Sequence, residues 1–186
     1  MKEDINKSVE QLRKGGVILY PTDTIWGLGC DACNEEAVKK IYDIKQRENA
    51  KSMLVLVDSI NMIERYVNEI PSIAYDILEV NEEPLTIIYP KAKNIASNLI
   101  APDGSIAIRI TNEKFSSELI YRFRKPIVST SANISGMPSP QSFYDIDEDI
   151  INLSDYVVKY RQSETYNGKP SGIIKIGMGG EIVVVR

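Results

Sequence analysis

The chain has 186 residues, 43% of them hydrophobic, and its 22 Lys and Arg against 26 Asp and Glu give a net charge of −4. This length and apolar content predict one domain over residues 1–186 and exclude a disordered, collagen-like or coiled-coil chain. The acidic balance excludes a global positive field, and the lack of any histidine excludes serine-histidine and cysteine-histidine catalysis.

Helical and extended patterns alternate along the first two thirds of the chain. Apolar residues at helical spacing predict helices near residues 5–12, 35–44, 59–67 and 115–123. Apolar runs bounded by turn residues predict strands near 17–20, 53–57, 85–89, 105–110, 127–129, 156–159, 173–176 and 182–185. This order predicts an α/β fold, a twisted mixed sheet flanked by helices, in which early strands form parallel pairs and the last short strands add antiparallel pairing.

No targeting or membrane segment is expected. The first six residues mix charges with no apolar stretch behind them, and the longest apolar runs, such as 53–57 and 182–185, are too short to span a bilayer. We therefore expect a cytoplasmic protein with no membrane partner.

Cys30 and Cys33 form a Cys-x-x-Cys motif. A zinc site normally has about four ligands, and with no histidine and no further cysteine one chain cannot complete it with those residue types. A redox role needs a lowered thiol pKa and stays open as the weaker hypothesis. Two buried, reduced thiols are the favoured interpretation.

Short nucleotide-binding motifs give one weak match. No P-loop occurs, whereas residues Gly27 to Ala32 match Gly-x-Gly-x-x-Ala, a dinucleotide fingerprint. The segment from Pro21 to Trp26 separates this match from the preceding strand, where the motif should open the turn directly. Nicotinamide binding is therefore kept only as a minor alternative.

Polar residues recur two positions apart in segments that look extended, where positions i and i+2 share one face of a strand. These are Thr22 and Thr24, then Ser105, Arg109 and Thr111, then Ser129, Ser131 and Asn133. Lys45 and Arg47 can converge on a single ligand only if the helix from Glu35 ends near Ile44. If these faces meet, they form a pocket of fixed cations ringed by hydroxyls, which suits a phosphate or a carboxylate.

Four segments follow one another in an order that is typical of a known family. They are Tyr20-Pro21-Thr22-Asp23-Thr24 with Gly27-Leu28-Gly29, Lys45-x-Arg47 with Lys51, Ser105-Ile106-Ala107-Ile108-Arg109, and Ser129-Thr130-Ser131-Ala132-Asn133-Ile134-Ser135-Gly136. In these segments the chain resembles the YrdC-type threonylcarbamoyladenylate synthases in their short, single-domain form.

This resemblance implies a reaction and its participants. Family members condense L-threonine, bicarbonate and ATP, with Mg²⁺, into threonylcarbamoyl-AMP and pyrophosphate. Threonylcarbamoyl-transferase proteins then modify tRNA to threonylcarbamoyladenosine, and tRNA is a further candidate partner. The family fold is a twisted α/β sheet with a concave positive face. The expected enzyme class is nucleotidyltransferase.

The resemblance also implies roles for individual residues. Lys45 and Arg47 are expected to be catalytic, and no residue is assigned to a metal. The expected threonine ligands are Thr24, Arg109, Ser129 and Ser171. The expected ATP ligands are Arg47, Lys51, Ser105, Ser131, Asn133, Ser139 and Arg186.

An RNA-binding relative without synthase activity is the alternative. Two basic groups motivate it, namely Lys39, Lys40, Lys45, Arg47 and Lys51, and Arg122, Arg124 and Lys125. Binding through such groups should weaken steeply with salt. The Lys-x-Arg and Ser-x-Asn pairs favour the enzyme, because an RNA binder does not need small hydroxyls gathered around its cations.

Overall fold

The strands form one nine-stranded mixed sheet in a computed structural model that describes residues 1–47, 53–165 and 170–186. Their order is β7-β1-β2-β6-β3-β5-β4-β8-β9. The strands are β1 (Ile18–Pro21), β2 (Trp26–Gly29), β3 (Leu54–Val57), β4 (Leu85–Tyr89), β5 (Ile106–Ile110), β6 (Ile127–Ser131), β7 (Tyr156–Val157), β8 (Gly172–Ile176) and β9 (Ile182–Val184). This architecture confirms the twisted mixed α/β sheet expected from the sequence.

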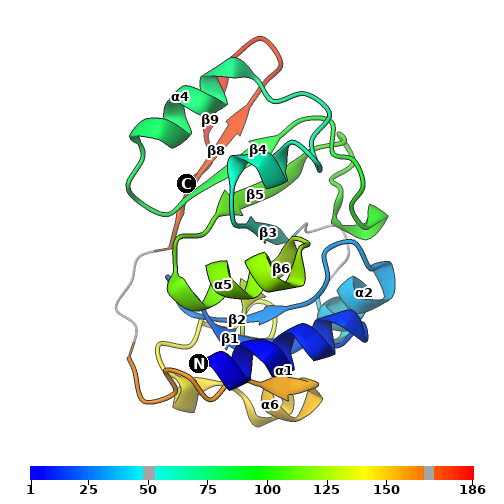
Figure 1. Ribbon diagram of the computed structural model, residues 1–186, viewed down its shortest axis with the longest axis vertical. Helices are drawn as coiled ribbons and strands as arrows, with labels where there is room; N and C mark the ends of the chain where they lie inside the picture. The colour runs from blue at the N-terminus through cyan, green and yellow to red at the C-terminus, as the bar shows by residue number, and fades with distance from the viewer. Residues whose placement is uncertain (48–52, 166–169) are drawn as a thin grey trace.

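Helices pack against this sheet, and α1 and α5 lie side by side on one face of it (Figure 1). The helices are α1 (Lys2–Arg13), α2 (Glu35–Ile44), α3 (Ile60–Ile63), α4 (Ser72–Val80), α5 (Lys114–Phe123) and α6 (Glu148–Leu153), with 3₁₀ turns η1 (Ser97–Leu99) and η2 (Phe143–Asp145). Helix α1 buries Ile5, Val9 and Leu12, and this apolar stripe explains both its formation and its docking.

The pairing of strands agrees with expectation in part, because β3 and β5 pair in parallel and β8 and β9 pair in the antiparallel sense. Other pairs differ from it. β1 pairs with β2, and β6 with both β2 and β3, in the antiparallel sense, although all four belong to the first two thirds of the chain. Conversely, the late strands β7 and β8 pair in parallel with β1 and β4. Strand β2, which was not predicted, accounts for two of these pairs, β1–β2 and β2–β6. A tight hairpin with β1 makes this strand antiparallel, and β6 then joins its other edge.

Gly27 and Gly29 lie inside β2 and serve close packing of strands. A Cβ atom on Gly29 would lie 2.8 Å from Cε1 of Tyr20 and 2.9 Å from the carbonyl oxygen of Val128. The Gly-x-Gly match is therefore part of a strand and not the phosphate-binding turn that a dinucleotide site requires. This placement removes the motif on which the nicotinamide alternative rested.

We expect Gly29→Ala to lower the free energy of unfolding by about 1–3 kcal/mol, because the added methyl group overpacks the β1–β2–β6 contact. Urea denaturation measures this change. Gly172→Ala is the matched control in a strand, since a Cβ there meets its nearest neighbour, Cδ1 of Leu85, at 3.4 Å, an ordinary contact. An equal loss in both variants would contradict the packing account.

The two cysteines are free thiols, as the favoured interpretation expected, but only Cys30 is buried and Cys33 is partly exposed. Cys30 is fully buried, and burial raises the pKa of both Cys30 and Cys33 above their ordinary value. A raised pKa lowers the thiolate fraction that redox chemistry needs. The structure therefore gives the redox hypothesis no support.

Candidate active site

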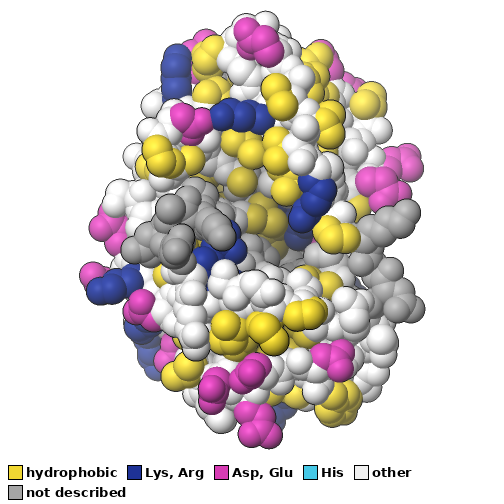
Figure 2. Space-filling model, turned by 180° about the vertical axis from the view of Figure 1, so that it is seen from behind, with side chains coloured by type: hydrophobic (Ala, Val, Ile, Leu, Met, Phe, Trp, Pro, Cys, Tyr) yellow, Lys and Arg dark blue, Asp and Glu magenta, His cyan; other side chains and the backbone are white. Residues whose placement is uncertain are grey.

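A cleft of about 490 Å³ brings together segments that are far apart in the sequence. Figure 2 shows a hollow across the face opposite the α1–α5 layer, with apolar side chains in its wall and Lys and Arg side chains at its edges. The volume lies within the ~300–1,000 Å³ typical of small-molecule sites. The lining residues come from the β1–β2 loop, β2, the end of α2, β3 to β6, β8 and the C-terminal residues 185–186.

All four expected threonine ligands line this cleft. Thr24, Arg109, Ser129 and Ser171 are each buried or nearly so, with exposed fractions of 3–8%. Arg109 and Ser129 lie on β5 and β6, the two strands that flank β3. The hydroxyl of Ser171 shares a hydrogen bond of 3.0 Å with that of Thr86. These four residues thus place one guanidinium among three hydroxyls in the cleft.

Arg109 is the most informative of these residues. Its side chain is 3% exposed, and its Nη2 donates to Oδ1 of Asp23 at 2.8 Å. Its Nε is buried and has no hydrogen-bond partner. Buried donors are normally paired, and the guanidinium fork matches a carboxylate in two-point geometry. The unused donor therefore marks Arg109 as a site for an anionic ligand.

Thr22 and Thr24 lie in the hairpin loop between β1 and β2, and not on one face of a strand as the sequence analysis assumed. The Oγ1 of Thr22 donates to the carbonyl of Ile25 at 2.6 Å and lies 3.2 Å from the Oγ1 of Thr24. Hydroxyl-to-backbone bonds of this kind close tight loops. The two threonines are close together, but for a different reason than predicted.

Helix α2 ends at Ile44, as the convergence of Lys45 and Arg47 required. Gln46 adopts a left-handed φ of +49°, and the Arg47 amide donates to the carbonyl of Tyr42 at 2.9 Å. With the bond from Gln46 to Asp43 at 3.1 Å, this is a Schellman ending. It turns the chain so that Arg47 lines the cleft.

Lys45 points under the cleft and does not line it. Its side chain is almost fully buried, and its ammonium donates to the carbonyls of Ser131 and, at 2.6 Å, Asn133. The Oδ1 of Asn133 is 3.4 Å away. Lys45 therefore ties the Lys-x-Arg and Ser-x-Asn segments to one another, while Arg47 and Ser131 reach the cleft.

The expected ATP ligands divide into three groups. Arg47, Ser131, Ser139 and Arg186 line the cleft. Ser105 and Asn133 do not. The Ser105 hydroxyl donates to Asp103 at 2.6 Å, and the Asn133 amide donates to the carbonyls of Ile134 and Met137. Lys51 lies outside the described residues.

Arg186 links the two sides of the cleft. Its Nε and Nη2 donate to the carbonyl of Ser171 at 3.2 and 3.0 Å, and its backbone bonds to that of Ile173. These bonds fix the C-terminal residue against β8.

Sequence reasoning missed the β4 wall of the cleft, formed by Thr86 and Ile88. These residues alternate along β4, so the same spacing rule that found Arg109 on β5 would have found them. Thr86 lies directly across the sheet from Arg109 by the register of β4 and β5. Trp26 and Gln141 also line the cleft and carried no recognisable signal.

The sequence of this chain is similar to those of known proteins. A family model for Sua5, YciO and YrdC proteins, described as "Telomere recombination", matches residues 10–186. The chain belongs to this family. Among its relatives, the threonylcarbamoyl-AMP synthase of Pseudoalteromonas translucida is 34% identical over 181 residues, which are 96% of this chain and 95% of that protein. A putative threonylcarbamoyl-AMP synthase of Methanocaldococcus jannaschii is 38% identical over 181 residues, 94% of this chain and 83% of that protein.

A solved structure supports the same family fold. P. abyssi Sua5 complexed with L-threonine superimposes with a TM-score of 0.87 at 29% identity. The match covers 95% of this chain and 52% of the Sua5 chain, so this Sua5/YciO/YrdC member spans about half the length of that protein.

Within the described ranges, no group of three or more His, Cys, Asp or Glu side chains could hold a metal ion. The described part of the cleft lining also contains no Asp or Glu side chain.

Four of the basic residues that motivated an RNA-binding relative are buried or bonded to other parts of the described chain. Lys45 is buried, and Lys40 donates to the carbonyl of Gly15 at 2.9 Å. Lys125 pairs with Asp31 at 2.7 Å, and Arg122 with Glu118 at 2.6 Å. None of these four lines the described part of the cleft.

Membrane insertion was not expected. In the described segments of the chain, no helix has both the length and the apolar character needed to cross a bilayer.

The buried ammonium of Lys45 gives a pH-dependent prediction. Burial, and then the charge of Arg47, lower the pKa of Lys45 from 10.5 to about 8. Between these values the unfolded chain binds more protons at this site than the folded chain, so the free energy of unfolding should rise with pH. Below about pH 8 both states are charged and this slope vanishes.

We therefore expect wild-type protein to gain up to ~1.4 kcal/mol per pH unit relative to Lys45→Met across this window. Urea titrations over the same pH range measure the difference in slope, which is independent of the overall stability of the variant. Parallel pH dependences of the two proteins would show that Lys45 keeps its ordinary pKa.

Proposed function

We propose that this chain condenses L-threonine, bicarbonate and ATP into threonylcarbamoyl-AMP and pyrophosphate for threonylcarbamoyladenosine modification of tRNA. The observation that carries the proposal is the buried, unpaired Nε of Arg109 in a cleft that also holds the hydroxyls of Thr24, Ser129 and Ser171. Arg109 suits the carboxylate of an amino acid, and the small hydroxyls suit its side chain and amine. The names of the relatives and the L-threonine complex of Sua5 support the same substrate.

The other side of the cleft suits a triphosphate. Arg47 and Arg186 present guanidinium groups there, with the hydroxyls of Ser131 and Ser139. Arg47 would be held in place by the Schellman ending of α2, and Lys45 would hold the Ser131 strand end from below. Such preplaced charges stabilise developing negative charge on phosphate oxygens better than mobile water does.

The proposed reaction has two bond-forming steps. The threonine amine adds to the carbon of bicarbonate, and loss of water gives an N-carboxylate. One oxygen of this carbamate then forms a bond to the α-phosphorus of ATP, while the bond between that phosphorus and the bridging oxygen of pyrophosphate breaks. In this scheme Arg109 orients the threonine carboxylate, and Arg47 faces the charge that builds on the phosphates. The enzyme class is nucleotidyltransferase.

The Mg²⁺ of the reaction would enter as the magnesium complex of ATP, because phosphate oxygens are hard, anionic ligands and the described cleft lining contributes no Asp or Glu side chain. Ser105 and Asn133 do not line the cleft, so they would affect ATP binding only indirectly, through the loops to which they are hydrogen-bonded.

The product requires consuming partners. Threonylcarbamoyl-transferase proteins would take the mixed anhydride and modify tRNA, and tRNA itself is a candidate partner. We propose that residues 1–186 work as a single domain in the cytoplasm, where ATP and tRNA are available. The RNA-binding alternative has no specific contact in its favour, because its basic residues are dispersed or paired.

Omission experiments test this function. Purified protein with Mg²⁺-ATP, L-threonine and bicarbonate should release pyrophosphate, and leaving out either threonine or bicarbonate should reduce the release to background. L-serine at the same concentration is the matched substrate control for the methyl group. Pyrophosphate release that is the same with and without threonine would overturn the proposal. Tight, salt-sensitive tRNA binding without nucleotide turnover would favour the alternative.

A further inference from the structure

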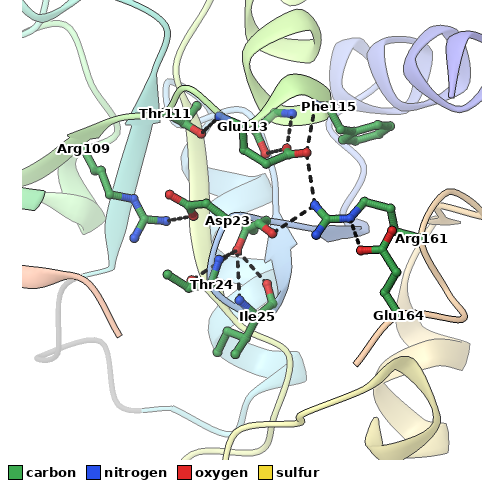
Figure 3. Close-up of polar contacts among 11 residues, drawn as sticks. Asp23, Thr24, Ile25, Arg109, Thr111, Glu113, Phe115, Arg161 and Glu164 are labelled. Atoms are coloured by element: carbon green, nitrogen blue, oxygen red, sulfur yellow. Dashed lines mark hydrogen bonds and ion pairs between the residues drawn. The ribbon is translucent and has the colours of Figure 1, made fainter. Parts of the chain in front are cut away.

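The loop that carries Asp23 and Thr24 lies between two arginines. Figure 3 shows Arg109 reaching Asp23 from one side and Arg161 reaching the backbone of the same loop from the other. Arg109 belongs to the cleft. Arg161 does not line it, and nothing in the sequence analysis singled it out.

Arg161 contacts three different segments. Its Nη1 donates to the carbonyl of Thr22 at 3.4 Å and to Oε1 of Glu113 at 3.2 Å. Its Nε donates to Oε2 of Glu164 at 2.6 Å. The Arg161 and Glu113 side chains are 20% and 10% exposed, so this ion pair is screened less than a surface pair.

Glu113 connects this contact to the strand that carries Arg109. It follows β5 by three residues, and its amide donates to the Oγ1 of Thr111 at 3.3 Å. Its carboxylate also caps α5, accepting from the amides of Phe115 at 3.1 Å and Ser116 at 2.7 Å. Glu113 is therefore fixed relative to both β5 and α5. Through it, Arg161 joins the Thr22–Ile25 loop to the end of the Arg109 strand.

The backbone conformation of Arg161 is one that a residue other than glycine rarely adopts. Its φ of +67° lies in the left-handed region, which is unfavourable for a residue with a Cβ. Such conformations persist where surrounding contacts determine them, and they cluster at functional sites.

We propose that Arg161 is a positioning residue for the threonine side of the cleft. This inference rests on the proposed function. Arg161 and Glu113 set the distance between the loop that carries Thr24 and the strand that carries Arg109, so that both meet one amino acid substrate. The ATP side is built from α2, β6 and the C-terminal residues, which these bonds do not reach.

The test compares Arg161→Gln with Arg161→Lys and with the control Arg122→Gln, which removes an arginine–glutamate pair at the other end of α5. For Arg161→Gln we expect the KM for L-threonine to rise about tenfold, and the KM for ATP to change less than about twofold. Arg161→Lys keeps one charged contact and should fall between the glutamine variant and wild type. Arg122→Gln should leave both KM values unchanged.

Two further readouts separate positioning from stability alone. Calorimetry of L-threonine binding should show the same loss of affinity without requiring turnover. Glu113→Gln combined with Arg161→Gln should weaken threonine binding by less than the product of the single effects, because both act through one contact.

Unchanged threonine affinity in Arg161→Gln, or equal rises in both KM values accompanied by a lowered Tm, would overturn the inference. Wild-type protein that binds threonine but releases no pyrophosphate would contradict the proposed function. In that case the calorimetric threonine affinities of wild type and Arg161→Gln would still test the positioning role of Arg161.

Discussion

Arg109→Lys is expected to lower kcat/KM for L-threonine by about 100-fold, which corresponds to about 2.7 kcal/mol of transition-state stabilisation. Lysine keeps the positive charge beside Asp23 but loses the planar fork, and with it the Nε donor that is buried without a partner in the free protein. The change isolates geometry from charge, because the formal charge of the cleft is the same.

The measurement is pyrophosphate release as a function of L-threonine concentration at saturating ATP and bicarbonate. The KM for ATP should change little, because the proposal assigns the phosphates to Arg47 and Arg186 and not to Arg109. Ser117→Ala, on the far helix α5, serves as a control for handling and folding. A lysine variant with wild-type kcat/KM for threonine would remove Arg109 from the substrate site.

Arg47→Ala should have the second large effect, a loss of about 10²–10³ in kcat/KM for ATP, the size seen when one preplaced electrostatic contact to a transition state is removed. Arg47 lines the cleft and is half-buried. The fold should persist, because α2 and its Schellman ending depend on backbone bonds of Tyr42, Asp43 and Gln46, and not on the guanidinium.

Steady-state kinetics with varied ATP measure the loss of kcat/KM, and urea denaturation measures whether the fold persists. Lys39→Ala is the matched control, since it removes an exposed cation from α2 without touching the cleft. A variant that unfolds, or one whose kcat/KM for ATP is unchanged, would require a different phosphate site.

The sequence predicted much of the sheet and the composition of the cleft, because both depend on local periodicity. The alternation along 105–111 placed Arg109 in the cleft wall, and the apolar face of α2 set the helix end at Ile44, which brings Arg47 to the cleft. Residues spaced for one face of a strand could be identified without knowing what the strand pairs with.

Other features depended on partners that lie far along the chain. Nothing local to Lys45 shows that its ammonium is buried beneath residues 131 and 133. Strand β2 contains two glycines and no β-branched residue, so its sequence did not predict a strand. Because β2 was not predicted, Thr22 and Thr24 were placed on a strand and not in a hairpin loop, and the antiparallel pairing of β1 was missed. Arg161 acts through residues 22 and 113, and no spacing rule connects these positions.

The central claim is that bicarbonate carbon and threonine become part of one adenylate in this cleft, and ¹³C-labelled bicarbonate tests it most directly. Mass spectrometry of the nucleotide products, formed from Mg²⁺-ATP and L-threonine, should find threonylcarbamoyl-AMP that carries the label. This product should disappear when threonine is omitted, and it should form much more slowly when Arg109→Lys replaces wild type. Labelled bicarbonate that is absent from every adenylate product, while pyrophosphate is still released, would contradict the account.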